Sequence, residues 1–154
     1  MAKCYQLVGV PGSGKTTWIS TQDWALTCAH VSTDKWVEIY AKEVGRTYSE
    51  VFDSFMPTAI HLMSKEVTTA REMNRDIIWD QTSTTVASRA RKFNMLPNYE
   101  HIAVVFNTPE HTELMRRLES RPGKEVPYHV VADMIAKFEM PIEEEGFSQI
   151  WVAS

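Results

Sequence analysis

The residues best suited to chemistry lie near the start of the chain, in the run Gly9-Val10-Pro11-Gly12-Ser13-Gly14-Lys15-Thr16. This run fits a phosphate-binding pattern of glycine, four free positions, glycine, lysine, and then serine or threonine. Successive backbone N–H groups can wrap an anion closely where glycines lack a Cβ atom, and the helix that follows directs its positive end at the same anion. The run therefore predicts a site for the phosphates of a nucleotide.

The residue types in this loop predict roles toward ATP and Mg²⁺. We expect Lys15 to reach the β- and γ-phosphates and Thr16 to offer its hydroxyl to a Mg²⁺ ion that arrives with ATP. The nucleotide-binding residues predicted from the loop are Gly12, Ser13, Gly14, Lys15, Thr16 and Thr17.

Two carboxylates follow strand-like runs. Asp34 comes after His30-Val31-Ser32-Thr33, and Asp80 ends Ile77-Ile78-Trp79-Asp80. Ligands of open parallel sheets bind beyond the carboxyl ends of the strands, so both side chains are candidates for the site. One would join the Mg²⁺ shell, and the other would orient an acceptor hydroxyl and take its proton, in an order that the sequence leaves open. In the alternative interpretation each aspartate only caps a helix.

A helix that ends in arginines and runs into a Pro/Gly loop is the third candidate feature. Arg117 and Arg121 are four positions apart and therefore lie on one helical face, and Pro122-Gly123 follows. Guanidinium groups carried there could close over a triphosphate as a lid and open to release product. The alternative is an ordinary surface helix in which Glu113 pairs with Arg117.

Short apolar runs alternate with helical patterns along the chain, which is typical of a parallel sheet with crossover helices. This predicts an α/β fold of three layers, with a central parallel sheet of about five strands, helices on both faces and the arginine-bearing lid. The expected strands are 4–8, 29–32, 75–80, 101–107 and 149–152, and the expected helices include 15–26, 35–44, 49–74, 110–120 and 128–140.

The longest predicted helix, 49–74, has an apolar stripe that we expect to face the core, and Pro57 within it predicts a kink or a division into two helices. The residues of that stripe are Phe52, Met56, Ile60, Met63, Val67 and Ala70.

Length and charge limit the function further. The chain has 154 residues with a net charge of -4, which predicts one domain over residues 1–154 and excludes attraction of nucleic acid to the whole surface. A local basic patch remains possible at Arg89, Arg91 and Lys92, with a plain solvated helix face as the alternative. Apolar runs are too short to span a membrane, and the cysteine count fits a reducing compartment, so we expect a cytoplasmic protein.

Taken together, these residues resemble the polynucleotide 5′-hydroxyl kinases of bacteriophages, within the small P-loop kinases. The similarity runs from residues 9–18 through Asp34 and the 80–82 turn to 113–117, Arg121 and the Val126-Pro127 pair, which is nearly the whole chain. It implies that the second and third strands lie on one side of the first strand and the others on the opposite side. It also implies the host cytoplasm as the location if a phage encodes the protein.

The resemblance also implies roles for single residues. ATP would be cradled at Lys15 and Thr16, Arg117 and Arg121 would hold its phosphates, and the catalytic set would be Asp34, as general base, with Lys15 and Arg121. Asp80 would lie beside the acceptor or the metal, which gives Thr16 and Asp80 as the metal-binding pair. The expected acceptor-binding residues are Asp34, Lys35, Asp80, Thr82 and Arg89.

One departure from the family concerns the acceptor. The arginine that binds the acceptor phosphate in the family lies three residues after the base, and Val37 stands at that position here. Lys35 is a candidate substitute, although a point charge does not reproduce a bidentate guanidinium clamp.

Three functions remain open at this stage. The first is an ATP- and Mg²⁺-dependent kinase acting on a hydroxyl of DNA or RNA, most simply the 5′-hydroxyl. The second shares this chemistry but takes a hydroxymethyl-pyrimidine of phage DNA, a nucleoside or another small alcohol as acceptor. The third is a nucleotide-binding regulator, which would have no need of a hydroxyl-activating Asp34. Oligomeric state is not readable from the sequence, although the family resemblance allows assembly.

Overall fold

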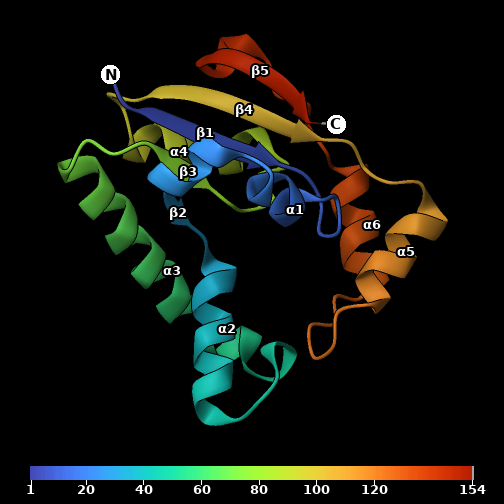
Figure 1. Ribbon diagram of the computed structural model, residues 1–154. Helices are drawn as coiled ribbons and strands as arrows, with labels where there is room; N and C mark the ends of the chain where they lie inside the picture. Colours follow the sequence, from blue (N-terminus) through green and yellow to red (C-terminus); the bar gives the residue numbers. More distant parts are fainter. Residues whose placement is uncertain (154) are drawn as a thin grey trace.

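Five parallel strands form a central sheet in the order β2-β3-β1-β4-β5 in the computed structural model, which describes residues 1–153 (Figure 1). This order confirms the predicted α/β class and the expected position of the second and third strands on one side of the first. The strands are β1 (Lys3–Val8), β2 (Ala29–Val31), β3 (Ile77–Trp79), β4 (Glu100–Phe106) and β5 (Phe147–Ala153).

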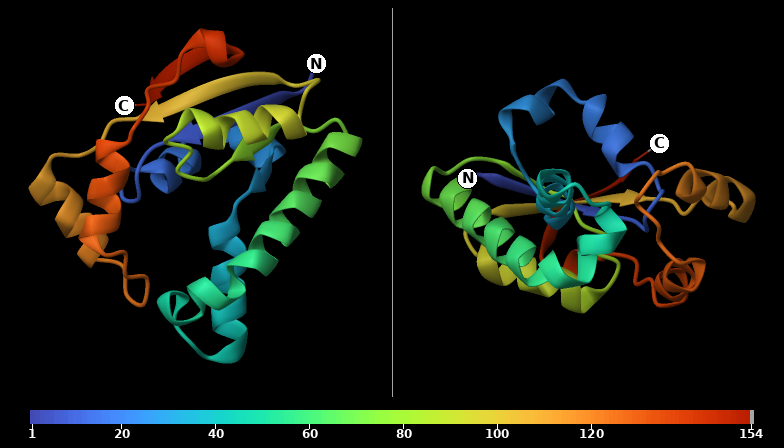
Figure 2. Two further views of the ribbon diagram at one scale, coloured as in Figure 1. Left: turned by 180° about the vertical axis from the view of Figure 1, so that it is seen from behind. Right: turned by 90° about the horizontal axis from the view of Figure 1, so that it is seen from below.

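Helices cover both faces of the sheet (Figure 2). One face carries α1 and the short 3₁₀ turn η1, and the other carries α3 and α4. The helices are α1 (Lys15–Ser20), α2 (Thr33–Val44), α3 (Tyr48–Glu72), α4 (Val86–Met95), α5 (His111–Glu119) and α6 (Tyr128–Ala136), with 3₁₀ turns η1 (Asp23–Thr27) and η2 (Glu143–Glu145).

The three central strands are almost completely buried, because a parallel sheet with helices on both faces has no solvated side. Met63 and Val67 of α3 pack with Trp79 and Leu96 on one face. On the other face, Tyr5 and its neighbours pack against tryptophans from α1, η1 and β5. This core fixes the carboxyl ends of β1, β2 and β3 at one edge, where the candidate site residues follow.

The predicted helix 15–26 ends early, at Ser20. The hydroxyl of Ser20 donates to the carbonyl of Thr17 at 2.6 Å, and that of Thr21 donates to the carbonyl of Trp18 at 2.7 Å. Hydroxyls that occupy helix carbonyls in this way compete with continuation of the helix. The chain instead forms η1, whose Trp24 packs edge-on to Trp18.

The predicted helix 49–74 forms as the single helix α3, with Pro57 inside it. The predicted core stripe is partly wrong: Phe52 and Ile60 are exposed, whereas Met63, Val67 and Ala70 are buried as expected. Upstream of Met63 the buried positions are Val51 and Ala59, each one position earlier than the predicted stripe residue. The N-terminal part of α3 packs on α2 rather than on the sheet, so a different side of the helix faces a neighbour.

Two helical units project from the carboxyl edge of the sheet and flank the loop after β1. One is the α2–α3 hairpin, and the other is α5 with α6 and the loop 120–127 between them (Figure 1). Within residues 1–153, no helix combines the length and apolar character needed to cross a membrane.

Candidate functional site

The glycine-rich loop connects β1 to α1, as its sequence predicts. Gly12 has a φ of 82° and Gly14 a φ of 100°, both in the left-handed region that residues with a Cβ atom rarely adopt. A Cβ atom on Gly12 would also lie 3.2 Å from the Leu114 side chain of α5. The glycines thus serve both the loop conformation and the close approach of α5.

Lys15 folds back over this loop. Its Nζ donates to the carbonyl oxygens of Gly9 at 2.8 Å and Val10 at 2.9 Å. Burial lowers the pKa of Lys15 to about 8, although the carboxylates of Asp80 and Asp34 act in the opposite direction. The loop carbonyls therefore hold the ammonium in place, and the negative charges of Asp80 and Asp34 favour its charged form.

The loop contains a buried polar group whose hydrogen-bonding capacity is unsatisfied. Ser13 Oγ is buried and has no hydrogen-bond partner among the described residues. Buried hydroxyls are normally satisfied, so this atom points to a polar ligand that completes the loop. Thr16 and Thr17 lie exposed on the first turn of α1, where their hydroxyls are available.

The two arginines of the predicted lid lie in different environments. Arg117 donates through Nη1 to the carbonyl oxygen of Gly12 at 3.0 Å and through Nε to Glu113 at 2.8 Å. The pairing with Glu113 that the alternative interpretation expects is present, and the same arginine also reaches the phosphate loop, whereas its role over a triphosphate stays a prediction. Hydrogen bonds from Arg116 and then Arg117 lower the pKa of Glu113 to about 2.

Arg121 lies beyond the end of α5 and is half-buried. Its guanidinium has no hydrogen-bond partner among residues 1–153. Its positive charge adds to the lowering of the Lys15 pKa by burial and opposes the raising of the Tyr48 pKa by burial. Arg121 is thus a cation between the phosphate loop and the α2–α3 hairpin.

Asp34 lies in the first turn of α2, with its side chain 52% exposed. Its Oδ1 accepts a hydrogen bond from the Tyr48 hydroxyl at 2.5 Å, and its Oδ2 lies 3.3 Å from Lys124 Nζ. Burial and then this hydrogen bond raise the pKa of Tyr48. The helix cap is Ser32, whose side chain accepts from the Lys35 backbone, so the interpretation of Asp34 as only a cap is wrong.

Asp80 follows β3 directly and is mostly buried. Its backbone N–H donates to the carbonyl of Val31 at 2.8 Å, and its Oδ2 pairs with His30 Nε2 at 2.9 Å. The cap of α4 is Thr85, so Asp80 is not a helix cap either. Next to Asp80, the carbonyl of Thr82 accepts from the Gly9 backbone N–H at 2.9 Å, which joins this turn to the phosphate loop.

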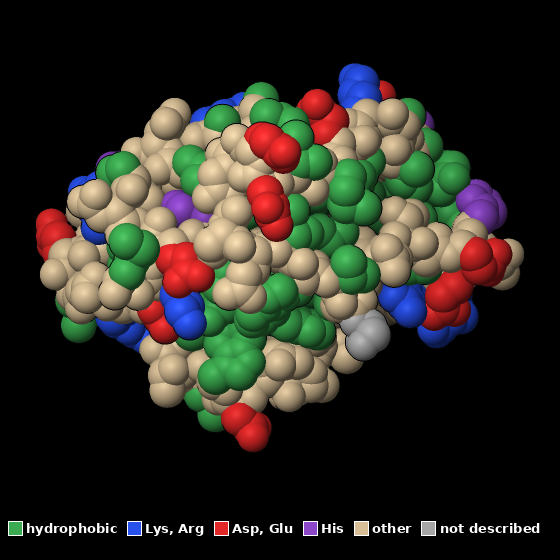
Figure 3. Space-filling model, turned by 90° about the horizontal axis from the view of Figure 1, so that it is seen from above, with side chains coloured by type: hydrophobic (Ala, Val, Ile, Leu, Met, Phe, Trp, Pro, Cys, Tyr) green, Lys and Arg blue, Asp and Glu red, His purple; other side chains and the backbone are tan. Residues whose placement is uncertain are grey.

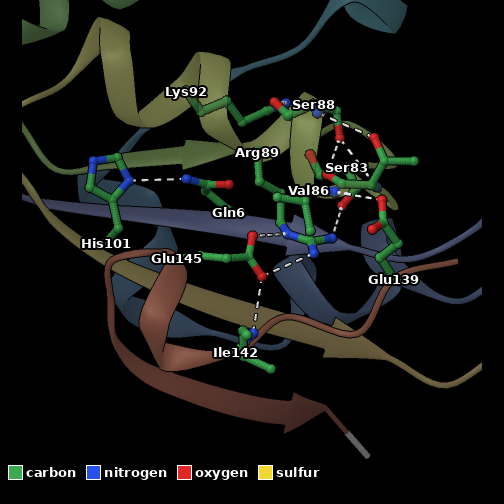
Figure 4. A network of polar contacts seen from close by, with 11 residues as sticks. Gln6, Ser83, Val86, Ser88, Arg89, Lys92, His101, Glu139, Ile142 and Glu145 are labelled. Carbon is green, nitrogen blue, oxygen red and sulfur yellow. Dashed lines mark hydrogen bonds and ion pairs between the residues drawn. The ribbon is translucent and has the colours of Figure 1, made fainter.

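The structure contradicts the predicted role of Arg89 in acceptor binding. Arg89 is 0% exposed and forms a bidentate ion pair with Glu145, while its Nη1 donates to the Ser83 carbonyl at 2.9 Å (Figure 4). A side chain held in this way has no access to substrate. It connects α4 to η2 instead, and Glu145 also accepts from the Ile142 backbone.

The predicted basic patch on α4 is also absent, because Lys92 is buried with Arg89 and only Arg91 remains exposed. Burial lowers the pKa of Lys92 to about 8. The alternative of a plain solvated face fails for the same reason: positions 89 and 92 lie on the inward side of the helix. On the face seen from above, basic side chains are scattered rather than gathered (Figure 3).

Lys35, the second predicted acceptor cation, is already paired. Its Nζ lies 2.6 Å from Glu66 Oε2 and donates to the His30 carbonyl at 2.9 Å. Val37 is 0% exposed and belongs to the packing between α2 and α3. Neither residue supplies a free cation beside Asp34.

Sequence reasoning missed the residues that surround Asp34, namely Tyr48, Lys124 and Glu38. Lys124 Nζ lies 2.8 Å from Glu38 Oε1 and 4.7 Å from the centre of the Tyr48 ring. Glu38 was readable, since it follows Asp34 by four positions on a helix. No local signal connects Lys124 or Tyr48 to Asp34.

The residues near the loop fit a Mg²⁺ ion that is bound mainly through nucleotide phosphates. Within residues 1–153, no three His, Cys, Asp or Glu side chains gather as a metal cage. Mg²⁺ typically keeps water and phosphate ligands and takes only one or two protein groups, which the Thr16 hydroxyl and the Asp80 carboxylate can provide.

A phosphate loop between β1 and α1, with the strand order described above, defines the class: the chain has the fold of P-loop kinases. The chain belongs to the family described as AAA domain, which matches residues 6–141.

A curated relative is the heterogeneous nuclear ribonucleoprotein U-like protein 2 of Mus musculus, 27% identical over 150 residues. The match covers 88% of this chain but only 19% of that protein, so the chain spans about a fifth of the length of this relative.

Solved structures share the fold. A protein from Chloroflexus aurantiacus assigned as a kinase superposes with a TM-score of 0.73 and 18% identity, over 99% of this chain and 87% of that chain. A chain of the Pnkp1/Rnl/Hen1 RNA repair complex superposes with a TM-score of 0.66 and 22% identity, over 88% of this chain and 43% of that chain.

Proposed function

We propose that residues 1–154 form one kinase domain that transfers the γ-phosphate of ATP to a hydroxyl of a nucleic acid, most simply the 5′-hydroxyl of DNA or RNA. The observation that carries the proposal is that the phosphate loop follows β1 at the centre of the parallel sheet, while Asp80 follows β3 directly and Asp34 lies in the first turn of α2 after β2. A phosphate donor site and a candidate base thus share one edge of the sheet.

The donor half of the site rests on the loop from Gly12 to Thr17. Its backbone N–H groups and Lys15 would hold the phosphates, and the orphaned Ser13 hydroxyl supports this assignment. Arg117 is already bonded to the loop, and Arg121 is free among the described residues to neutralise charge on the γ-phosphate. Mg²⁺ bound with ATP, at Thr16 and Asp80, would withdraw charge from the phosphate oxygens.

The acceptor half centres on Asp34. The acceptor oxygen forms a bond to the γ-phosphorus, the bond to the leaving ADP oxygen breaks, and the hydroxyl proton passes to the Asp34 carboxylate. Each carboxylate oxygen has two acceptor positions, so Asp34 can receive this proton while Tyr48 and Lys124 hold its orientation. A pure nucleotide-binding regulator has no need of such an oriented carboxylate.

Three similarities support a nucleic-acid acceptor. They are the resemblance to phage polynucleotide kinases, the shared fold with a chain of an RNA repair complex, and the match to a ribonucleoprotein. All three are consistent with chemistry at a polynucleotide end.

A small alcohol or a hydroxymethyl-pyrimidine of phage DNA is the second candidate acceptor. It is favoured by Val37 at the position of the family's acceptor-phosphate arginine, and by the burial of Arg89 and Lys92, which removes both cations from contact with a long strand. These acceptors require the same donor site and the same base.

The test is transfer of label from γ-labelled ATP to a panel of acceptors: 5′-hydroxyl DNA, 5′-hydroxyl RNA, hydroxymethyl-pyrimidine DNA and free nucleosides. We expect label on a 5′-hydroxyl strand. Label only on the modified base or on nucleosides would replace the proposal with the second candidate. ATP binding without label on any acceptor would contradict the kinase function and support a regulator.

A further inference from the structure

His30 and Asp80 lie on neighbouring strands and on one face of the sheet. His30 of β2 pairs with Ile78 of β3 in the parallel register, and Asp80 follows Ile78 by two positions. Side chains alternate along an extended strand, so Ile78 and Asp80 point to the same side as His30. Asp80 continues the ladder, because its backbone N–H donates to the carbonyl of Val31 at 2.8 Å. The pairing of the two strands therefore brings the imidazole next to the carboxylate.

This face of the sheet is the one that carries α1 (Figure 2). Ile78 belongs to the apolar cluster against which Trp18 of α1 packs, whereas Trp79 belongs to the core on the opposite face. Thr16 lies in the first turn of α1, directly after the phosphate loop. The Asp80 side chain thus shares a face of the sheet with the hydroxyl that we expect beside it in binding Mg²⁺.

A direct hydrogen bond connects the two side chains. His30 Nε2 lies 2.9 Å from Asp80 Oδ2. An ionised carboxylate has no proton to donate, so the imidazole donates through its Nε2–H. Oδ1 of the same carboxylate has no hydrogen-bond partner among residues 1–153, and the Asp80 side chain is only 17% exposed. One carboxylate oxygen is therefore held by His30, and the other stays available to a cation.

Packing does not account for the position of His30. Its side chain is 44% exposed, whereas its strand neighbour Val31 is buried. A half-exposed imidazole buries little apolar surface, and an exposed pair of side chains contributes little to stability. The backbone is nevertheless held, because the His30 carbonyl accepts from Lys35 Nζ at 2.9 Å and Lys35 pairs with Glu66 of α3. In the described part of the chain, Asp80 is the polar partner of the imidazole.

We propose that His30 is a positioning residue for magnesium: its Nε2–H fixes the Asp80 carboxylate so that one oxygen remains available to the ion that enters with ATP. This inference rests on the proposed kinase function, which assigns Thr16 and Asp80 to Mg²⁺. A hydrogen bond to a carboxylate ligand orients that ligand before the metal binds, and loss of such an outer partner typically lowers metal affinity about 10- to 100-fold. His30 acts through Asp80 rather than on the nucleotide.

The experiment measures how strongly the full chain engages the metal of a bound nucleotide. Calorimetric titration gives the Kd of a non-hydrolysable ATP analogue in EDTA and with saturating Mn²⁺, and the readout is the first Kd divided by the second. We expect His30→Ala to lower this ratio about 10-fold or more, while the Kd in EDTA stays within about twofold of the wild type. His30→Gln, whose side-chain amide offers an N–H in place of Nε2–H, should recover most of the loss.

A double-mutant cycle tests whether His30 acts through Asp80. Asp80→Asn should lower the ratio by itself, and adding His30→Ala to it should cause no further loss. The matched control is His61→Ala, which removes an exposed histidine of α3 and should leave the ratio unchanged. Thermal unfolding of each variant checks that the fold is retained.

Three outcomes would overturn the inference. A ratio in His30→Ala equal to that of the wild type, even where both affinities fall, would assign His30 to the edge of the sheet alone. Losses that add in the double variant would give His30 a contact separate from Asp80. A wild-type ratio near 1 would remove the metal from Asp80.

The test is separate from the kinase proposal, because nucleotide and Mn²⁺ binding require no transfer to an acceptor. If no acceptor is phosphorylated while His30→Ala still lowers the ratio, the kinase proposal fails and the role of His30 at the metal stands. If acceptors are phosphorylated and the ratio does not change in His30→Ala, the kinase proposal stands and the role of His30 is rejected.

Discussion

Asp34 and Lys124 are 90 positions apart in the chain, yet Lys124 Nζ lies 3.3 Å from Asp34 Oδ2. The contact joins the loop after α5 to the first turn of α2. The same ammonium also pairs with Glu38 Oε1 at 2.8 Å, so one cation connects the loop 120–127 to two carboxylates of α2.

Replacement of the candidate base tests its assignment. Asp34→Asn should lower kcat by about 100-fold or more, because the amide cannot accept the hydroxyl proton, while the affinity for ATP stays within about twofold. Single-turnover transfer and ATP titration measure the two quantities. Glu38→Gln is the matched control, since Glu38 also contacts Lys124 but is not assigned to the reaction. Normal transfer by Asp34→Asn would refute the role.

The buried ammonium of Lys15 predicts how ATP binding depends on pH. Its pKa near 8 in the free protein means that the lysine loses its charge as pH rises through 8, whereas bound phosphates favour the charged form. The contribution of Lys15 to the affinity for ATP should be nearly constant below about pH 7 and should fall by up to about tenfold per pH unit above 8. Lys15→Met should bind ATP weakly with no such dependence above pH 8, where ATP itself is fully ionised. A pH-independent wild type would contradict the loop interpretation.

The guanidinium of Arg121, which has no partner within the described residues 1–153, predicts a role in the rate. Arg121→Ala should lower kcat by about 100-fold or more, with a smaller loss of ATP affinity, because charge on the transferred phosphate is greatest during the reaction. Arg116→Ala is the control: this arginine is 68% exposed and pairs with Glu113 at the surface. If the two variants turn over equally fast, Arg121 does not act on the phosphates.

The ion pair between Arg89 and Glu145 predicts a stability effect in place of the acceptor role expected from sequence. Arg89→Met leaves a buried carboxylate without its partner and should lower the free energy of unfolding by about 3–5 kcal/mol. Adding Glu145→Gln should restore a large part of this loss, since the uncompensated charge is removed. Urea unfolding at neutral pH measures both variants. Unfolding curves of Arg89→Met that match the wild type would show that the pair contributes little.

Much of the fold was predictable because its signals are local. Periodicity identified all five strands, and the phosphate loop was readable because eight consecutive residues define its backbone and its lysine. The errors have physical causes. Hydroxyls of Ser20 and Thr21 capture helix carbonyls and end α1 early, and the start of α3 packs on α2 instead of the sheet.

The candidate site also has a part that the sequence predicted and a part that only the packing decided. The sequence alone determined the phosphate loop and both strand-end carboxylates, Asp34 and Asp80, since strand ends of a parallel sheet meet at one edge. Only the tertiary structure decided which basic side chains lie beside these two carboxylates. Which side of a helix faces the protein interior is set only when neighbouring elements pack against it. The sequence therefore predicted Arg89 on the surface, whereas it is buried in the structure. Lys124 contacts Asp34 because the loop 120–127 packs against the α2–α3 hairpin, a contact between distant segments that no spacing in the chain encodes.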